Sequence, residues 1–153
     1  MRQGKPAVCL RVFFVIFVSF QLLACKSSLP ITSASFSNSD GSSSPELRLE
    51  IAETNSTRQL GLMYRKEMSE TGGMLFIFPD ETERAFWMKN TYLGLDIIYL
   101  NSDKQVVSIS KNAVPHSLKR RESKLPAKYV VELLAGSSEK WKITPGSQLK
   151  TAP

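Results

Sequence analysis

The sequence predicts a mainly β (α+β) domain, a compact antiparallel sandwich or half-open barrel of about seven short strands with two short helices. Short apolar segments recur along the chain and are separated by turn residues. Two of these segments, at 95–100 and 105–110, are joined only by Asn-Ser-Asp-Lys, which is typical of a hairpin connection. Because the helical segments are too short to cover a sheet, a ferredoxin-like α+β layer is the second choice.

The first strand is expected at 46–52, where leucine and isoleucine alternate with charged residues. A short helix should begin near Thr57, with Ser56 and Gln59 as its capping box. Gly61 is costly in a helix, so a large side chain or a backbone segment should cross close to it. Further strands are expected at 72–79, 85–90, 95–100, 105–110 and 128–136, followed by a helix capped by Ser137 and an edge strand near the C-terminus.

Residues 1–24 have the features of a secretory signal peptide. Bases precede the apolar run "VFFVIFVSF", and the apolar stretch is shorter than the roughly 20 residues of a membrane-spanning helix. The run ends in "LLAC", which resembles a bacterial lipobox and implies cleavage before Cys25 and acylation of its sulfur. The alternative is an ordinary signal peptide with a chance cysteine. Acylation is favoured because Cys9 leaves with the signal, and one leftover thiol is unusual in an exported chain.

Residues 25–45 are expected to form the lipidated anchor and a flexible Ser-rich tether, and 46–153 a single domain. Removal of residues 1–24 takes away three bases and no acid, which lowers the formal charge from +6 to +3. This mild charge does not indicate nucleic-acid binding. We expect a monomer in the cell envelope, anchored to the lipid bilayer of a bacterial membrane. The periplasmic face of the outer membrane is favoured, because Lys26 rather than Asp follows the anchor.

The segment "FWMKNT" at 86–91 places large apolar side chains next to a polar cluster. If 91–94 is a hairpin loop, Lys89 faces Asp96 at the end of an apolar strip that includes Trp87. One interpretation is a cross-strand ion pair near the rim of the sheet. The other is the polar floor of a ligand pocket with Trp87 as an apolar wall.

Five segments occur in a specific order: "GLMYRKEM", "GGMLFIF", "FWMKNT", "LDIIYL" and "VVELLAG…ITPGSQL". Together they resemble the family called domain of unknown function 192, over about residues 47–149. The resemblance implies a small, mainly β domain that is often exported and has no established activity. It also makes the polar residues after Trp87 a family signature. The predicted ligand-binding residues are Arg65, Trp87, Lys89, Asn90, Thr91 and Asp96.

The residue inventory favours binding over catalysis. His116 is the single histidine, and the domain lacks free cysteines, so we expect no metal site and no cofactor. The predicted function is a membrane-tethered, extracytoplasmic domain that binds a small molecule, a glycan or a peptide. The alternatives are an envelope interaction module and, less favoured, a hydrolase that uses carboxylates such as Asp96 and Glu132. The basic residues at 119–128 are expected to be solvated, with a weak membrane-facing role as their alternative.

Overall fold

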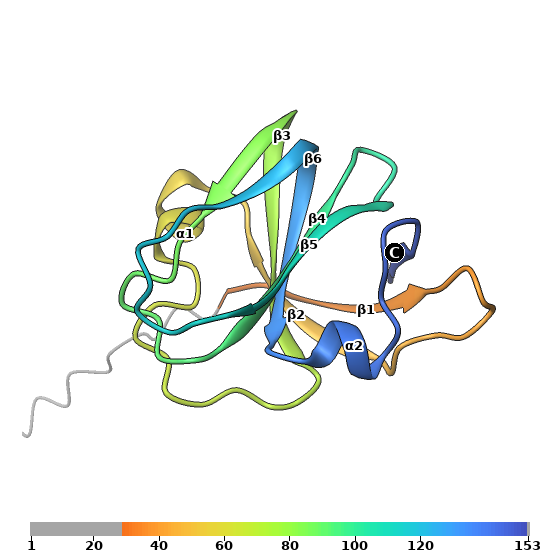
Figure 1. Ribbon diagram of the computed structural model, residues 1–153, viewed down its shortest axis with the longest axis horizontal. Coiled ribbons are helices and arrows are strands. Elements are labelled where there is room, and N and C mark those ends of the chain that lie inside the picture. The colour runs from red at the N-terminus through yellow and green to blue at the C-terminus, as the bar shows by residue number, and fades with distance from the viewer. Residues whose placement is uncertain (1–28, 153) are drawn as a thin grey trace, which may run out of the picture.

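The computed structural model describes residues 29–152, which form one seven-stranded sheet with two short helices (Figure 1). This confirms the predicted mainly β class. In chain order the elements are β1 (Ile31–Ser37), β2 (Leu47–Ala52), α1 (Asn55–Leu60), β3 (Gly72–Phe86), β4 (Leu95–Leu100), β5 (Val106–Ala113), β6 (Arg121–Leu134), α2 (Ser137–Lys140) and β7 (Gln148–Thr151). The strand order is β5-β4-β6-β3-β2-β1-β7.

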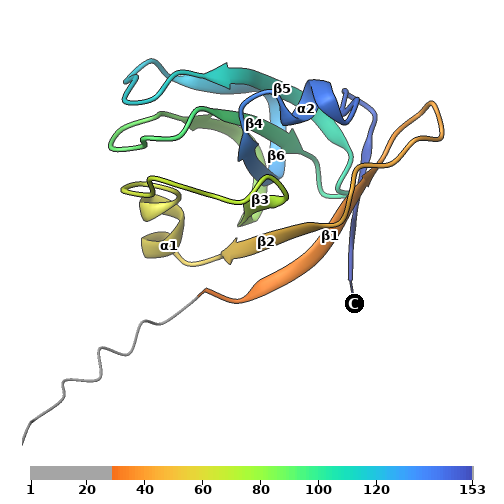
Figure 2. The same ribbon diagram turned by 90° about the horizontal axis from the view of Figure 1, so that it is seen from below.

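The sheet curls until its two edge strands meet (Figure 2). Gln105, beside β5, forms an antiparallel bridge with Gln148 of β7. The backbone N–H of Val106 donates to the carbonyl of Ser147 at 2.8 Å, and that of Leu149 donates to the carbonyl of Lys104 at 3.0 Å. These bonds hold the strand edges together locally, which gives the predicted half-open barrel.

Two apolar clusters occupy the two faces of the curled sheet. The inner cluster takes side chains from all seven strands, among them Phe36, Leu49 and Val131. The outer cluster lies mainly on β3, β4 and β6 and includes Phe76 and Tyr99. Because side chains alternate between faces along a strand, successive residues of β3, β4 and β6 belong alternately to the inner and the outer cluster. β3, β4 and β6 are therefore buried on both sides.

Residues 31–37 are the main departure from the sequence-based prediction of a flexible tether at 25–45. They form β1, which pairs antiparallel with both β2 and β7. Phe36 and Ala34 of this strand are buried in the inner cluster. The Ser-rich composition gave no local signal for a strand here. The strand depends on pairing with β7, which lies at the other end of the chain. The predicted signal peptide and Cys25 lie outside the described residues.

The hairpin expected between 85–90 and 95–100 does not form. β3 continues through Phe86 and pairs with β2 and β6, whereas β4 lies between β5 and β6. Residues 87–94 are therefore a loop. The strands expected separately at 72–79 and 85–90 are one strand, because the charged residues after Pro79 also belong to β3. A register shift between Ile77 and Thr82 accommodates them.

Several shorter elements lie where the local sequence pattern predicted them. The β4–β5 hairpin and the edge strand β7 lie where they were predicted. Helix α1 begins beside the predicted position, but its capping box uses Thr54 and Thr57 rather than Ser56 and Gln59. β2 and β3 pair in parallel, with α1 in the connection between them. Within residues 29–152, neither helix has the length and apolar character needed to cross a membrane.

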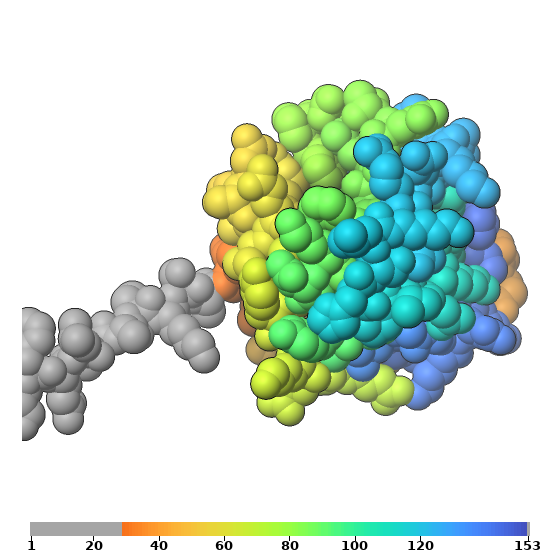
Figure 3. Space-filling model, turned by 60° about the vertical axis from the view of Figure 1, so that its left-hand side comes forward, coloured from red at the N-terminus to blue at the C-terminus, as the bar shows by residue number. Residues whose placement is uncertain are grey.

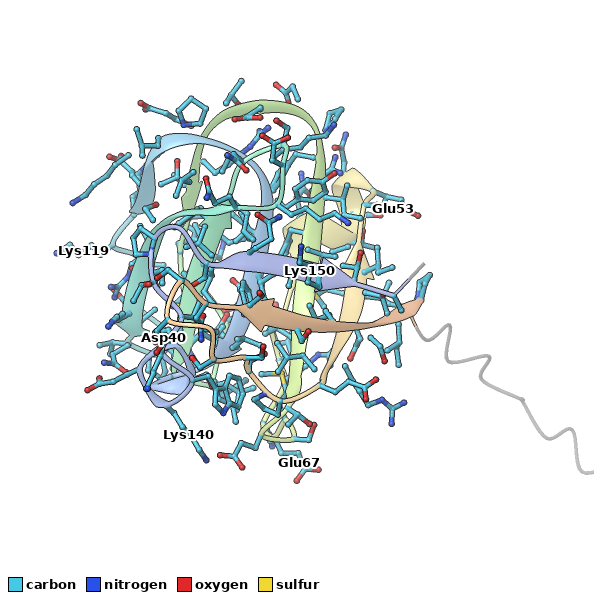
Figure 4. All side chains as sticks on the ribbon, turned by 90° about the vertical axis from the view of Figure 1, so that its right-hand side faces the viewer. Asp40, Glu53, Glu67, Lys119, Lys140 and Lys150 are labelled. Carbon is cyan, nitrogen blue, oxygen red and sulfur yellow. The ribbon has the colours of Figure 1, made fainter. Side chains whose placement is uncertain are left out.

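Charged side chains surround the barrel, and the ion pairs at its α2 end are exposed. Lys142 Nζ lies 3.3 Å from the Asp40 carboxylate, and Lys140 contacts Glu70. Figure 4 shows Asp40 and Lys140 near this end, and Lys119 extending away from the ribbon. Such exposed pairs contribute little to stability, so the core and the β ladders hold the fold together.

Candidate functional site

A cavity of about 500 Å³ lies over the outer face of the sheet, between α1, β3 and the start of the loop 87–94. These segments meet on the face shown in Figure 3. The volume falls within the range of small-molecule sites. The lining residues are Asn55, Arg58, Gln59, Leu60, Gly61, Leu62, Met63, Phe76, Phe78, Ala85, Phe86, Trp87, Thr91 and Glu132.

The walls of the cavity are largely aromatic. Phe76 and Phe86 meet edge to face with ring centroids 5.0 Å apart, and Phe78 meets Phe86 in the same way at 6.4 Å. All three rings project from β3 toward the outer cluster. Trp87 follows directly and is half exposed at the mouth. The aromatic part of "FWMKNT" therefore forms both the core support and the rim of the cavity.

Gly61 lets helix α1 end directly over this aromatic wall. Its backbone has a φ of +49°, which disfavours a side chain. A Cβ added there would lie 3.3 Å from Cζ of Phe76. The sequence-based expectation that a large group crosses close to Gly61 is thus confirmed, and the group is the Phe76 ring. Leu62 then turns into the outer cluster.

The loop after Trp87 is held by hydrogen bonds within the outer face. Met88 is fully buried, and its backbone N–H donates to the carbonyl of Ser117 at 2.9 Å. Asn90 has a φ of +53°, a conformation that asparagine tolerates better than most residues. Its carbonyl accepts from the backbone N–H of Tyr64 at 2.8 Å, and its amide donates to the Tyr64 hydroxyl at 2.8 Å. Asn90 thereby ties this loop to the segment that follows α1.

Glu132 of β6 lies at the inner end of the cavity. Its nearest partners across the sheet are Met74 of β3 and Ile97 of β4, which are both fully buried. Only 5% of Glu132 is exposed, and nothing within residues 29–152 donates a hydrogen bond to its carboxyl group. Burial raises the pKa of Glu132 to about 8, because the charged form loses its hydration.

Two of the six residues predicted from the sequence line the cavity, namely Trp87 and Thr91. The other four lie elsewhere. Lys89 is exposed, with its Nζ 5.2 Å from the centroid of the Trp87 ring. Arg65 makes a bidentate ion pair with Glu50 at 2.5 Å, and this pairing raises the pKa of the guanidinium. The contacts of Asn90 are those described above.

Asp96 lies on the other face of the sheet from the cavity. It is directly opposite Leu133, which belongs to the inner cluster. Its carboxylate accepts hydrogen bonds from the backbone N–H of Asn112 at 2.8 Å and from Ser138. Asp96 is thus held by β5 and α2, and the expected pairing with Lys89 is not formed. Since Glu132 points to the outer face, these two carboxylates do not flank a common space.

Glu132 was expected only as a possible hydrolase carboxylate, and Arg58 was not among the site residues predicted from the sequence. The signal for Glu132 was present, because it is the single acid inside the apolar run "YVVELLA". Arg58 lines the cavity, and its guanidinium lies 5.1 Å from the Phe78 ring centroid. Nothing in the sequence indicated that Arg58 would lie beside Phe78. Residues 29–152 contain no group of three or more His, Cys, Asp or Glu side chains arranged to share a metal ion.

Comparison with known proteins places this architecture in a family. The family model DUF192, described as an uncharacterized ACR, matches residues 36–151. A solved structure from Sinorhizobium meliloti 1021, described as a candidate transcription regulator, is 38% identical with a TM-score of 0.79; the match covers 81% of this chain and 95% of that one.

A protein of unknown function from Novosphingobium aromaticivorans DSM 12444 is 30% identical with a TM-score of 0.74; the match covers 82% of this chain and 89% of that one. The search of curated proteins found no match. The family match spans most of the chain and the whole of the sheet from β2 to β7. The chain therefore belongs to the DUF192 family, whose activity is uncharacterised.

Proposed function

We propose that this domain binds a small molecule with an apolar body in the cavity between α1, β3 and the loop that begins at Trp87. The observation that carries the proposal is the cavity itself, which combines aromatic walls with a few polar groups at fixed positions. Ligand sites are commonly built in this way. The sequence-based hypothesis of a binding cleft beside Trp87 is kept, with Trp87 and Thr91 in it and with Lys89 outside it.

Binding is favoured over hydrolysis because of the arrangement of the carboxylates. Hydrolysis of a glycoside by two carboxylates requires that both flank the scissile bond. Asp96 and Glu132 project from opposite faces of the sheet: Asp96 lies on the face of the inner cluster, and Glu132 lines the cavity on the outer face. A single carboxyl group inside an aromatic cavity supports recognition of a ligand more readily than two-carboxylate chemistry.

We also propose that the domain works in the cell envelope, tethered to a membrane by acylated Cys25. The support is the sequence "VFFVIFVSFQLLAC", an apolar run that ends in a lipobox-like motif. A single acyl chain binds membranes weakly and two or more bind firmly. Cys25→Ala is therefore expected to move the protein from the membrane pellet to the soluble fraction. Unchanged pelleting with an unchanged mass would contradict the tether without affecting the cavity.

The cavity is tested with ethylbenzene, a probe without polar groups, in an NMR titration of the purified protein. We expect shifts of the amide signals of Leu62 and Phe76 and weaker binding in Trp87→Ala. Tyr92→Ala is the matched control, because Tyr92 lies in the same loop and is equally exposed but does not line the cavity. No shift in the native protein, or an equal loss of binding in both variants, would contradict the proposed site.

A further inference from the structure

Glu132 has an arrangement that neither the fold nor the packing requires. It is nine-tenths buried among apolar side chains, it opens into the cavity, and its carboxyl group accepts no hydrogen bond from residues 29–152. Buried polar groups are nearly always hydrogen-bonded, and an unpaired one is costly. An apolar residue at this position would continue the outer cluster without that cost. The carboxyl group is thus a feature to be explained by what enters the cavity.

The donors around Glu132 are engaged elsewhere. Arg58 on α1 donates to the carbonyl of Ile77 at 2.7 Å and to the side chain of Asn55 at 2.6 Å. Tyr99 on β4 donates its hydroxyl proton to the carbonyl of Arg121 at 2.6 Å. Lys89 lies over the Trp87 ring near the mouth. Arg58 and Tyr99 therefore donate to other acceptors and not to Glu132. The Nε of Arg121 is buried without a hydrogen-bond partner among residues 29–152, so it does not donate to Glu132 either. The carboxyl group of Glu132 is thus left to accept a hydrogen bond from a molecule that enters the cavity.

We propose that the cavity selects ligands whose apolar body ends in a primary ammonium group, and that Glu132 accepts a hydrogen bond from that ammonium. This inference rests on the proposed binding function. Ammonium groups supply charge-assisted hydrogen bonds, which are stronger than neutral ones. The rings of Phe76, Phe86 and Trp87 present further favourable surface to a cation. A ligand carboxylate would meet the ionised form of Glu132 as one acceptor facing another, so we expect it to bind weakly at pH 8.

The pH dependence of ligand affinity provides a second, independent test of this inference. Burial raises the pKa of Glu132 to about 8, so the free cavity holds a protonated carboxyl at pH 6. An incoming ammonium favours the carboxylate, and the proton of Glu132 is released to solvent. The affinity for an amine should therefore increase between pH 6 and pH 8, by up to about tenfold per pH unit. Arg58, Lys89, Tyr99 and Arg121 are the other titratable groups around this region. Burial raises the pKa of the Tyr99 hydroxyl above its ordinary value.

The test compares three probes that share one phenylethyl body: ethylbenzene, 2-phenylethylamine and 3-phenylpropionate. Each is titrated calorimetrically into the native protein and into Glu132→Gln at pH 6 and pH 8. We expect the native protein at pH 8 to bind the amine at least about tenfold more tightly than ethylbenzene and to bind the carboxylate more weakly than either. In Glu132→Gln, the ratio of amine to ethylbenzene affinity should fall toward one and lose its pH dependence.

The outcomes separate this inference from the proposed function. If ethylbenzene binds but the native protein shows no preference for the amine, the inference is overturned and the apolar cavity stands. The same holds if Glu132→Gln keeps the preference. If none of the three probes binds the native protein, both proposals fail. Should the variant not fold, the pH dependence of amine affinity in the native protein decides, since a flat profile contradicts a role for Glu132.

Discussion

Asp96 accepts two hydrogen bonds from Ser138, one from the backbone N–H at 2.9 Å and one from the hydroxyl at 2.6 Å. The contact joins β4 to α2, because Ser138 lies 42 positions after Asp96 in the chain. A third bond, from the N–H of Asn112, joins the same carboxylate to β5. All the polar partners of Asp96 are thus structural, and they are provided by segments that close the end of the barrel.

We therefore expect Asp96→Asn to destabilise the fold by about 1.5–3 kcal/mol, because an amide cannot accept at both of its ends. Urea unfolding measures the loss, and ethylbenzene titration should show an unchanged affinity. Ser138→Ala is the partner control, which removes one of the three bonds and should cost less. Unchanged stability combined with lost probe binding would instead place Asp96 in the ligand site.

Glu132 should make the stability of the fold depend on pH. Because its folded-state pKa is raised to about 8, the native state holds this proton over a range in which the unfolded chain has released it. Stability from this group is complete below the ordinary glutamate pKa and is lost as pH rises toward 8, with a slope of about 1.4 kcal/mol per pH unit. Glu132→Gln should remove this slope. The measurement is urea unfolding of both proteins from pH 5 to pH 8.5, and parallel profiles would contradict the raised pKa.

Gly61 should be sensitive to the smallest side chain. Gly61→Ala introduces a Cβ at a positive φ and 3.3 Å from the Phe76 ring, so we expect a loss of about 1–3 kcal/mol and a weaker affinity for ethylbenzene. Gly41→Ala is the matched control, since Gly41 also has a positive φ but no atom within 4 Å of the added Cβ. An equal loss in both variants, measured by thermal unfolding, would show that contact with Phe76 has no part in the effect.

Phe36 tests whether β1 is an integral part of the fold. Its ring is fully buried in the inner cluster, so Phe36→Ala should cost about 3–5 kcal/mol. Ile31 lies on the same strand but is 52% exposed, and Ile31→Ala should change stability by less than about 0.5 kcal/mol. Urea midpoints compare the two variants. If Phe36→Ala is as stable as Ile31→Ala, residues 31–37 behave as the tether that composition had suggested.

The sequence by itself determined the elements whose signals are local. Alternation in "ELRLEIA", the Asn-Ser-Asp-Lys turn between β4 and β5, and the apolar run before Gly136 identified strands that the structure contains. The order of its motifs identified the family. The mainly β class with a half-open barrel could be predicted because period-two patterns and turn residues act over a few positions.

Tertiary structure alone decided what depends on partners far away in the chain. Residues 31–37 form the strand β1 because they pair with β2 on one side and β7 on the other. Lys89 does not face Asp96 because β4 pairs with β5 and β6 and not with β3. Strand pairing sets which face each side chain occupies, and a change of partner moves a residue from one environment to another. Trp87 and Thr91, two of the residues named from the sequence, do line the cavity, but the hairpin that was expected to bring them to Asp96 does not form. The position of the Glu132 carboxyl at the cavity became visible only when β6 was placed between β3 and β4.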